Sequence, residues 1–234
     1  MSGEFEQNDI LLFKFEKTTK GCRLKHFLHF LNSGGVRRPI RFAYIEAEGP
    51  LISNLSLREN IYLDSIPNSL SETKDFQMKS FLQRSSNHHL IDFYNRIPLL
   101  DELPGDVDAQ TRKMAALFKG LLQSADYLFL ESPERYLDDQ ALEVFTSALR
   151  FQTASRSQTV LLDSSNPKLW TPYASKVVLQ SSGGNYDVEP ILSGKVKRKF
   201  LELAHTEPIP EGNLRFLNLD TLLVAPTDKK KKAA

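Results

Sequence analysis

Residues 127–138 read YLFLESPERYLD, and this stretch decides the fold class. The apolar run at 127–130 predicts a short buried strand, which Pro133 separates from an amphipathic helix over residues 138–151. Leu142, Phe145 and Leu149 form the apolar face of that helix. A second apolar run follows at residues 159–162. Short apolar runs alternating with helices are typical of an α/β protein with a parallel sheet covered by helices.

The same alternation extends in both directions along the chain. Upstream, residues 109–125 carry apolar side chains at i, i+3, i+4, i+7 and i+8, which predicts a long amphipathic helix. Further strands are expected at residues 10–15, 40–45 and 176–179, and further helices at 24–31, 54–61 and 73–96. In the second of these helices, Ser56 and Glu59 have the spacing of a capping box. Residues 181–187, SSGGNYD, read as a turn or loop.

These elements suggest one α/β domain over residues 1–182, with a helical subdomain at about 62–106. Residues 183–224 are expected to form a C-terminal extension, and 225–234 a disordered lysine-rich tail. The tail could touch acidic lipid headgroups or nucleic acid, but four lysines are more often a solubilising end.

Composition excludes several classes of protein. The 234 residues have a net charge of +1, which predicts no nucleic-acid partner. The single cysteine excludes a disulfide framework and a cysteine-rich metal site. No apolar run reaches the length of a membrane span, and acidic residues interrupt the first 30 positions, so no signal peptide is predicted. We therefore expect a cytoplasmic protein, which could still lie on the inner face of a membrane through a membrane-protein partner.

Residues 44–61, YIEAEGPLISNLSLRENI, resemble a segment of the nucleotide-binding domain of ABC-type ATPases. That family segment contains a glutamine that contacts the metal and the attacking water, and it ends in Glu-Asn-Ile, as residues 59–61 do here. The gap-free alignment places Ala47 at the position of the glutamine. The resemblance implies a P-loop NTPase-like core, with a mixed or parallel sheet flanked by helices, plus a helical subdomain.

The resemblance continues through residues 107–138 and into TVLLDSSNP at 159–167. It places Asp108, Ala109 and Gln110 in the glycine-rich signature, whose backbone N–H groups contact a partner's γ-phosphate. Glu131 takes the place of the Walker B aspartate, and Ser132 that of the general base. A serine cannot take a proton from water unaided at neutral pH. The D-loop aspartate corresponds to Asp138, and the switch histidine to Ser165.

The phosphate loop of the family is also missing. Active members need G-x-x-x-x-G-K-[S/T] after the first strand, because its backbone N–H groups and lysine hold the phosphates. The equivalent place reads KTTKGCRL, residues 17–24, and so the degenerate loop consists of Lys20, Gly21, Cys22 and Arg23. The sequence therefore favours no bound cofactor, although ATP with magnesium stays possible, and it predicts no metal site.

Other chemistry-bearing residues have simpler interpretations. The basic residues near position 20 could hold a phosphate at a helix N-terminus, but a solvated basic face is commoner. Cys22 could be a reactive thiol between basic neighbours, yet no partner histidine supports catalysis. The histidine pairs at 88–89 and at 26 and 29 are more often surface or packing residues than metal ligands.

The resemblance implies a catalytically inactive ABC ATPase-like subunit that acts as a scaffold or regulatory partner. Its expected partner is a membrane permease-type subunit, which the family docks through the region equivalent to residues 47–105, or an active ABC ATPase subunit. A homodimer or a heterodimer is compatible with the sequence. Two alternatives stay open: a nucleotide-binding protein without hydrolysis, and an unrelated α/β interaction protein.

Overall fold

The computed structural model describes residues 9–15, 23–33, 40–49, 51–66, 77–83, 87–156, 158–180 and 185–191. The chain divides into two compact units, Met1–Ala204 and His205–Ala234, and every described residue belongs to the first. The predictions for Lys20, Gly21, Cys22 and the lysine-rich tail lie outside the described residues.

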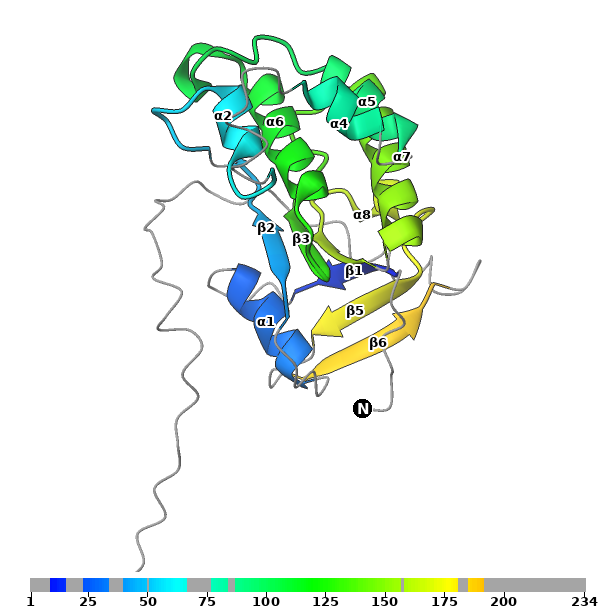
Figure 1. Ribbon diagram of the computed structural model, residues 1–234. Helices are drawn as coiled ribbons and strands as arrows, with labels where there is room; N and C mark the ends of the chain where they lie inside the picture. Colours follow the sequence, from blue (N-terminus) through cyan, green and yellow to red (C-terminus); the bar gives the residue numbers. More distant parts are fainter. Residues whose placement is uncertain are drawn as a thin grey trace, which may run out of the picture. The chain divides into compact units, whose positions relative to one another are not determined.

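A six-stranded sheet with the strand order β2-β3-β4-β1-β5-β6 forms the centre of the first unit (Figure 1). The strands are β1 (Ile10–Lys14), β2 (Phe42–Ile45), β3 (Tyr127–Glu131), β4 (Thr159–Asp163), β5 (Lys176–Gln180) and β6 (Tyr186–Pro190). All neighbouring pairs are parallel except β5 and β6, which are antiparallel. The predicted α/β class with a mixed sheet is confirmed, and so are the five predicted strands.

The prediction of a turn over residues 181–187 is wrong at its end, because β6 begins at Tyr186. Its first side chain is buried, whereas Asp187 is exposed and the next two residues are half-buried. A strand with one buried apolar residue lacks the continuous apolar run that marks β1, β3 and β4.

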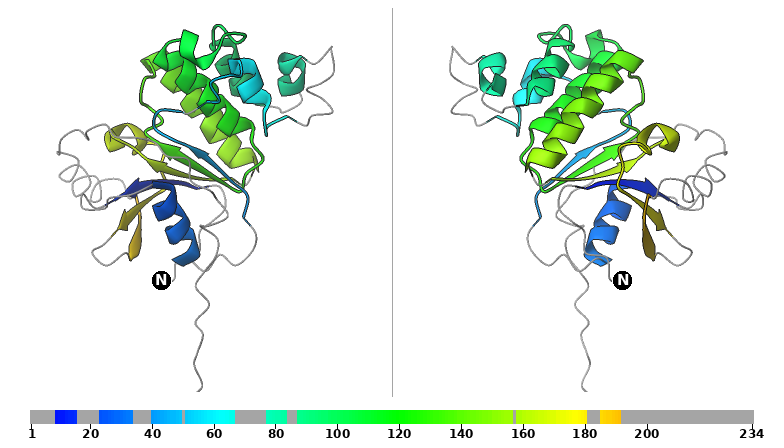
Figure 2. Two further views of the ribbon diagram at one scale, coloured as in Figure 1. Left: turned by 90° about the vertical axis from the view of Figure 1, so that its left-hand side faces the viewer. Right: turned by 90° about the vertical axis from the view of Figure 1, so that its right-hand side faces the viewer.

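Helices cover both faces of the sheet (Figure 2). On one face lies α1 (Arg23–Ser33), whose buried side chains include Phe27 and Phe30. Both rings pack edge-on against Phe13 of β1, with centroids 4.9 and 4.8 Å away. Edge-to-face aromatic pairs of this kind add to the stabilisation from burial. The opposite face is covered by α6 (Ala109–Leu122) and α7 (Asp139–Arg156).

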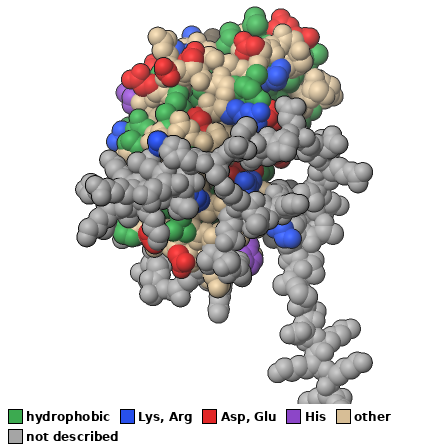
Figure 3. All heavy atoms as spheres, turned by 180° about the vertical axis from the view of Figure 1, so that it is seen from behind, with side chains coloured by type: hydrophobic (Ala, Val, Ile, Leu, Met, Phe, Trp, Pro, Cys, Tyr) green, Lys and Arg blue, Asp and Glu red, His purple; other side chains and the backbone are tan. Residues whose placement is uncertain are grey.

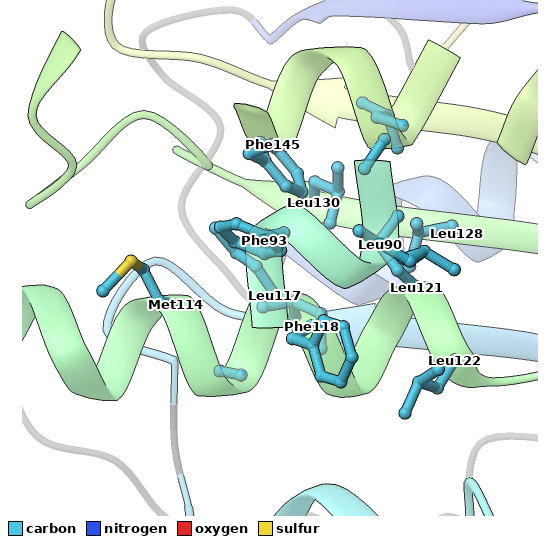
Figure 4. Packing of buried hydrophobic residues seen from close by; sticks show 14 of the residues in the cluster. Leu90, Phe93, Met114, Leu117, Phe118, Leu121, Leu122, Leu128, Leu130 and Phe145 are labelled. Carbon is cyan, nitrogen blue, oxygen red and sulfur yellow. The ribbon is translucent and has the colours of Figure 1, made fainter. Parts of the chain in front are cut away.

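The core on the α6 and α7 face is shown in Figure 4. There Phe93 and Phe145 lie together, with ring centroids 5.6 Å apart, beside Leu117 of α6 and Leu130 of β3. All four side chains are buried. The predicted apolar faces of the two long helices are confirmed, and α7 extends five residues beyond the predicted end at residue 151.

Shorter helices lie beyond the α6 and α7 layer or beside it. They are α2 (Leu57–Tyr62), α4 (Met78–Gln83), α5 (His88–Asn95), the 3-10 turn η1 (Pro104–Asp106) and α8 (Pro167–Trp170). The region predicted to be helical, residues 73–96, contains α4 and α5, and Asn87 caps the second of these helices by accepting a hydrogen bond from the Leu90 amide. The capping box of α2 is confirmed: Ser56 accepts from the Glu59 amide, and the Glu59 carboxylate accepts from the Ser56 amide.

The helices that follow β1 and β4 lie on opposite faces of the sheet, although these strands are neighbours. After β1 the chain enters α1, whereas after β4 it enters α8, whose Trp170 belongs to the core on the other face. In open α/β sheets, ligands bind outside the carboxyl ends of strands at such a switch point. The carboxyl edge of β1 to β4 is therefore the expected position of a functional site.

None of the described helices is both long and apolar enough to cross a lipid bilayer.

A candidate functional site at the carboxyl edge of the sheet

The carboxyl edge is rich in acidic side chains, which lie at the last residues of β3 and β4 and in the segments that follow β2 and β3. The acidic residues are Glu46, Glu48, Glu131, Glu134 and Asp163. The cations that contact these segments in the described part of the chain are Arg23, Lys113 and Arg135. On the face seen in Figure 3, acidic and basic side chains of the described residues are interspersed.

At the position of the phosphate loop, the described residue is Arg23 at the start of α1. Its Nε atom lies 3.0 Å from Oδ2 of Asp163, and its guanidinium carbon lies 4.6 Å from the centre of the Phe15 ring. Burial raises the pKa of Asp163 to about 6, against the opposing effect of Arg23, and the nearby charges of Glu131 and Glu134 add to the rise. The Nη1 atom of Arg23 is buried and makes no hydrogen bond to the described residues.

Ala47, at the predicted glutamine position, lies beside Glu131, at the predicted Walker B position. The Ala47 amide donates a hydrogen bond to Oε2 of Glu131 over 3.3 Å. The methyl side chain of Ala47 offers neither a donor nor an acceptor. Burial raises the pKa of Glu46, and the negative charge of Glu131 raises it further. The structure therefore brings these two predicted positions together through the backbone of one and the side chain of the other.

Lys113 of α6 is fully buried beneath this contact. Its ammonium donates hydrogen bonds to the carbonyl oxygens of Glu46, Ala47 and Glu131 at 2.9, 2.8 and 3.2 Å. Burial lowers the pKa of Lys113 to about 8, because the charged form is separated from water. Glu134 is the carboxylate that most favours the charged form. One ammonium thus joins the segment after β2 to the end of β3.

Ser132, at the predicted general-base position, has a left-handed backbone with a φ of +40°. Its amide donates to the carbonyl oxygen of Asp163 over 2.7 Å, so the turn after β3 is fastened to the end of β4. Few residues other than glycine adopt such a φ, and the conformation stores strain that the surroundings must hold.

Glu134 fastens the same turn to the segment that follows β4. Its Oε1 atom accepts hydrogen bonds from the hydroxyls of Ser164 and Ser165, both over 2.8 Å, and from the Asn166 amide over 3.2 Å. Its Oε2 atom accepts from Nε1 of Trp170 over 3.0 Å. Ser165, at the predicted switch-histidine position, is therefore held by a carboxylate of the chain itself.

The predicted signature lies at the start of α6. Asp108 is the N-cap, and its Oδ1 accepts a hydrogen bond from the Thr111 amide over 2.7 Å. This backbone hydrogen bond is the main cause of the lowered pKa of Asp108, so the carboxylate stays charged. Ala109 is the first residue of the helix, and Gln110 donates from Nε2 to Oδ2 of Asp138 over 2.8 Å. Asp138, at the D-loop position, also accepts from the Ala141 amide and so caps α7.

A further set of contacts joins the segment after β2 to the turn after β3. Arg135 forms an ion pair with Oε1 of Glu48 over 2.6 Å, and the Tyr136 hydroxyl donates to the other oxygen over 2.7 Å. Within the described part of the chain, no group of three or more histidine, cysteine, aspartate or glutamate side chains could hold a metal ion.

The predicted positions make four contacts within the described chain. Ala47 meets Glu131, Gln110 meets Asp138, and Ser132 meets the end of β4, whereas Ser165 meets Glu134, a residue for which the sequence suggested no role. Lys113 was also not predicted to contact the carbonyl oxygens at this edge. It lies four residues before Leu117 on the buried stripe of α6, and a lysine in that register was the available signal.

No protein-family model matches the chain, and no curated protein matches its sequence. Solved structures do match. An ATP-binding subunit of an ABC transporter has a TM-score of 0.62 and 16% sequence identity, over 85% of this chain and 89% of that one. A dimeric ATP-binding cassette in a post-hydrolysis state, bound to ADP and Pi, has a TM-score of 0.56 and 11% identity, over 80% of this chain and 88% of that one.

An RNase-L inhibitor matches with a TM-score of 0.61 and 15% identity, over 85% of this chain and 37% of that longer one. Together these matches show that the chain has the α/β fold of an ABC-type ATPase nucleotide-binding domain. The predicted resemblance to that fold is confirmed.

Proposed function

We propose that this chain, with its ABC-type ATPase fold, is a catalytically silent subunit that works by binding a partner protein. The observation that carries the proposal is the Asp108 carboxylate at the start of α6, which accepts a hydrogen bond from the Thr111 amide. In the family this helix start offers backbone N–H groups to a partner's γ-phosphate. A charged carboxylate uses one of those donors and repels a phosphate by like charge.

The remaining positions support the same proposal. Ala47, Ser132 and Ser165 carry no group that could activate water at neutral pH. Arg23, the described cation at the β1 end, is paired with Asp163 among the five acidic side chains of the edge. These carboxylates would repel the phosphates of a nucleotide, and the described cation is already paired, so we derive no hydrolytic step for the chain.

The partner surface that we propose lies around the start of α2. Three large apolar side chains are exposed there: Ile52 at 44%, Leu99 at 58% and Leu103 at 42%. The backbones around them are joined, because the Leu57 amide donates to the carbonyl of Glu102 over 2.9 Å. Leu99 also has a φ of +53°, a conformation that costs free energy and yet presents the leucine to solvent. Exposed apolar patches of this kind often mark protein interfaces.

The matching structures support the proposed class of partner. One of them is an ATP-binding subunit of an ABC transporter, and another is a dimeric cassette. The proposed partner is therefore a membrane permease-type subunit or an active ATPase subunit, with the chain in the cytoplasm or on the inner face of a membrane.

A second candidate function is nucleotide binding without hydrolysis. It is favoured by the buried Nη1 atom of Arg23, which has no hydrogen-bond partner among the described residues and lies at the switch point. We favour the silent subunit because Asp163 already pairs with the same guanidinium.

Calorimetric titration of the purified full chain with magnesium ATP separates the two functions. We expect no binding heat at millimolar nucleotide and no phosphate release above the buffer rate. Binding that disappears in Arg23→Gln would contradict the silent subunit and establish the nucleotide-binding alternative. Arg150→Gln is the matched control, because it removes the same charge from an exposed position within α7.

A further inference from the structure

Two charged side chains at the carboxyl edge, Lys113 and Glu134, each form several hydrogen bonds to other segments of the chain. The Lys113 ammonium has three hydrogen-bond acceptors, and all three are backbone carbonyl oxygens. The Glu134 carboxylate has four hydrogen-bond donors, all of them from residues 164–170. We refer to Lys113 and Glu134 as the two internal charges.

The two internal charges act on the three segments that form the edge, namely residues 46–49, 131–136 and 163–170. Lys113 connects the first segment to the second through the carbonyls of Ala47 and Glu131. Glu134 belongs to the second segment and connects it to the third. The three segments are therefore fastened in series by the protein alone.

The burial of Lys113 makes its contacts hard to replace with water. The side chain is fully buried, so if it withdrew, three carbonyl oxygens would lose their donor in a site that water reaches poorly. Gly49 reinforces the arrangement, because its backbone lies against α6 at Ala116 and at the stem of Lys113. The segment 46–49 thus packs on the same helix that supplies the ammonium.

In a nucleotide-dependent protein of this fold, a magnesium ion and phosphates would be the charges between these segments. We infer that the two internal charges hold the three segments in one arrangement without nucleotide, so that the surface offered to a partner does not vary with nucleotide. The inference rests on the proposed binding function and specifies its regulation: nucleotide bound to this chain does not control whether the partner binds.

Hydrogen exchange of the full chain tests the inference at particular amides. The Ala47 amide donates to Glu131, the Gly49 amide to the Glu46 carbonyl, and the Asn166 amide to Glu134. In the wild type these amides should exchange slowly without nucleotide, and millimolar magnesium ATP should leave their rates unchanged. An increase in protection on adding magnesium ATP would overturn the inference, because the nucleotide would then supply what we assign to the chain.

A pair of lysine variants separates the internal charge from a general loss of stability. Lys113→Met should speed exchange of residues 46–49 by about tenfold or more relative to β1 and β4. Lys119→Met is the matched control on the same helix, since Lys119 is paired only distantly with Asp64, over 3.9 Å. Equal exchange of residues 46–49 in the two variants would overturn the inference.

If Lys113→Met fails to fold, the second internal charge gives an independent test. Glu134→Gln keeps the size of the side chain and one acceptor oxygen, and should speed exchange at Asn166 and residues 164–170. Glu143→Gln, at an exposed position on α7, is its control and should leave that segment unchanged. Unchanged exchange in Glu134→Gln would overturn the inference.

Calorimetry on the same samples distinguishes this inference from the proposed function. Nucleotide binding without any change in exchange would contradict the silent subunit while supporting the internal charges. No nucleotide binding, together with unchanged exchange in Lys113→Met and Glu134→Gln, would support the silent subunit and contradict the role of the two internal charges.

Discussion

Gly49 lies directly against Ala116 of α6: a Cβ atom built on Gly49 would be 3.0 Å from the Cβ of Ala116. Gly49 also has a φ of +61°, which glycine adopts without steric cost and other residues rarely adopt. These two constraints fix where the chain turns after β2, and with it the carbonyls that Lys113 binds.

Gly49→Ala should lower the free energy of unfolding by about 2 kcal/mol, because it adds backbone strain and a close contact at one position. Urea denaturation followed by circular dichroism measures the change. The control is Gly105→Ala in η1, where an added Cβ meets no heavy atom within 4 Å. Equal losses in the two variants would contradict this explanation.

Asp108→Ala should destabilise the chain by about 1 kcal/mol, because the Thr111 amide at the start of α6 loses its acceptor. Asp108→Asn, which keeps an acceptor oxygen, should lose much less. Thermal unfolding of the two variants checks the difference. If both lose the same stability, the charge rather than the cap is what matters.

Lys113→Met should lower the free energy of unfolding by about 3 kcal/mol at pH 7, since it leaves three buried carbonyl oxygens without a donor. Lys119→Met, which breaks a long and partly exposed ion pair, should cost less than about 1 kcal/mol. Urea denaturation of both variants under one set of conditions makes the comparison. A smaller loss in Lys113→Met than in Lys119→Met would be inconsistent with the geometry.

Asp163 predicts a specific pH dependence of stability. Its pKa in the folded chain is about 6 against an ordinary value of 3.8, so the folded state binds the proton more tightly. The resulting stabilisation is complete below about pH 4 and is lost as the pH rises through 6, with a total of about 3 kcal/mol. Asp163→Asn should remove this part of the pH dependence in urea denaturation between pH 4 and 8. An identical pH profile in wild type and variant would show that Asp163 does not contribute.

Leu99→Ser should weaken partner binding without loss of stability, because the leucine is 58% exposed and serine meets the same positive φ without adding a larger side chain. The measurement is the yield of the integral membrane protein that copurifies with the tagged chain from detergent-solubilised membranes. Leu63→Ser, at an exposed apolar position after α2, is the control for a general effect of lost apolar surface. An equal yield for the wild type, Leu99→Ser and Leu63→Ser would exclude Leu99 from the interface.

The parallel part of the sheet was predictable because each strand is a continuous apolar run between polar segments. In β3 and β4, four successive residues are buried, so the sequence shows burial on both faces directly. The antiparallel β6 was not predictable in this way. Its pairing with β5 depends on the tertiary position of Tyr186 beneath α1, which no local pattern encodes.

At the site, the sequence indicated which positions differ from the family but not what replaces the missing ligands. The gap-free segments placed Ala47 and Glu131 at positions that the structure does bring together. Lys113 and Glu134 looked like an ordinary helix lysine and a turn glutamate, because their roles arise from contacts with segments 18 to 67 residues away.

Trp170 is the chain's single tryptophan, and it is fully buried with its indole N–H bonded to Glu134. The protein therefore carries its own fluorophore at the junction of the β3 turn and the segment after β4. Its emission spectrum reports on that one junction, without labelling and without a background from other indoles. Stopped-flow mixing with magnesium ATP would follow this junction in real time through the fluorescence of one side chain.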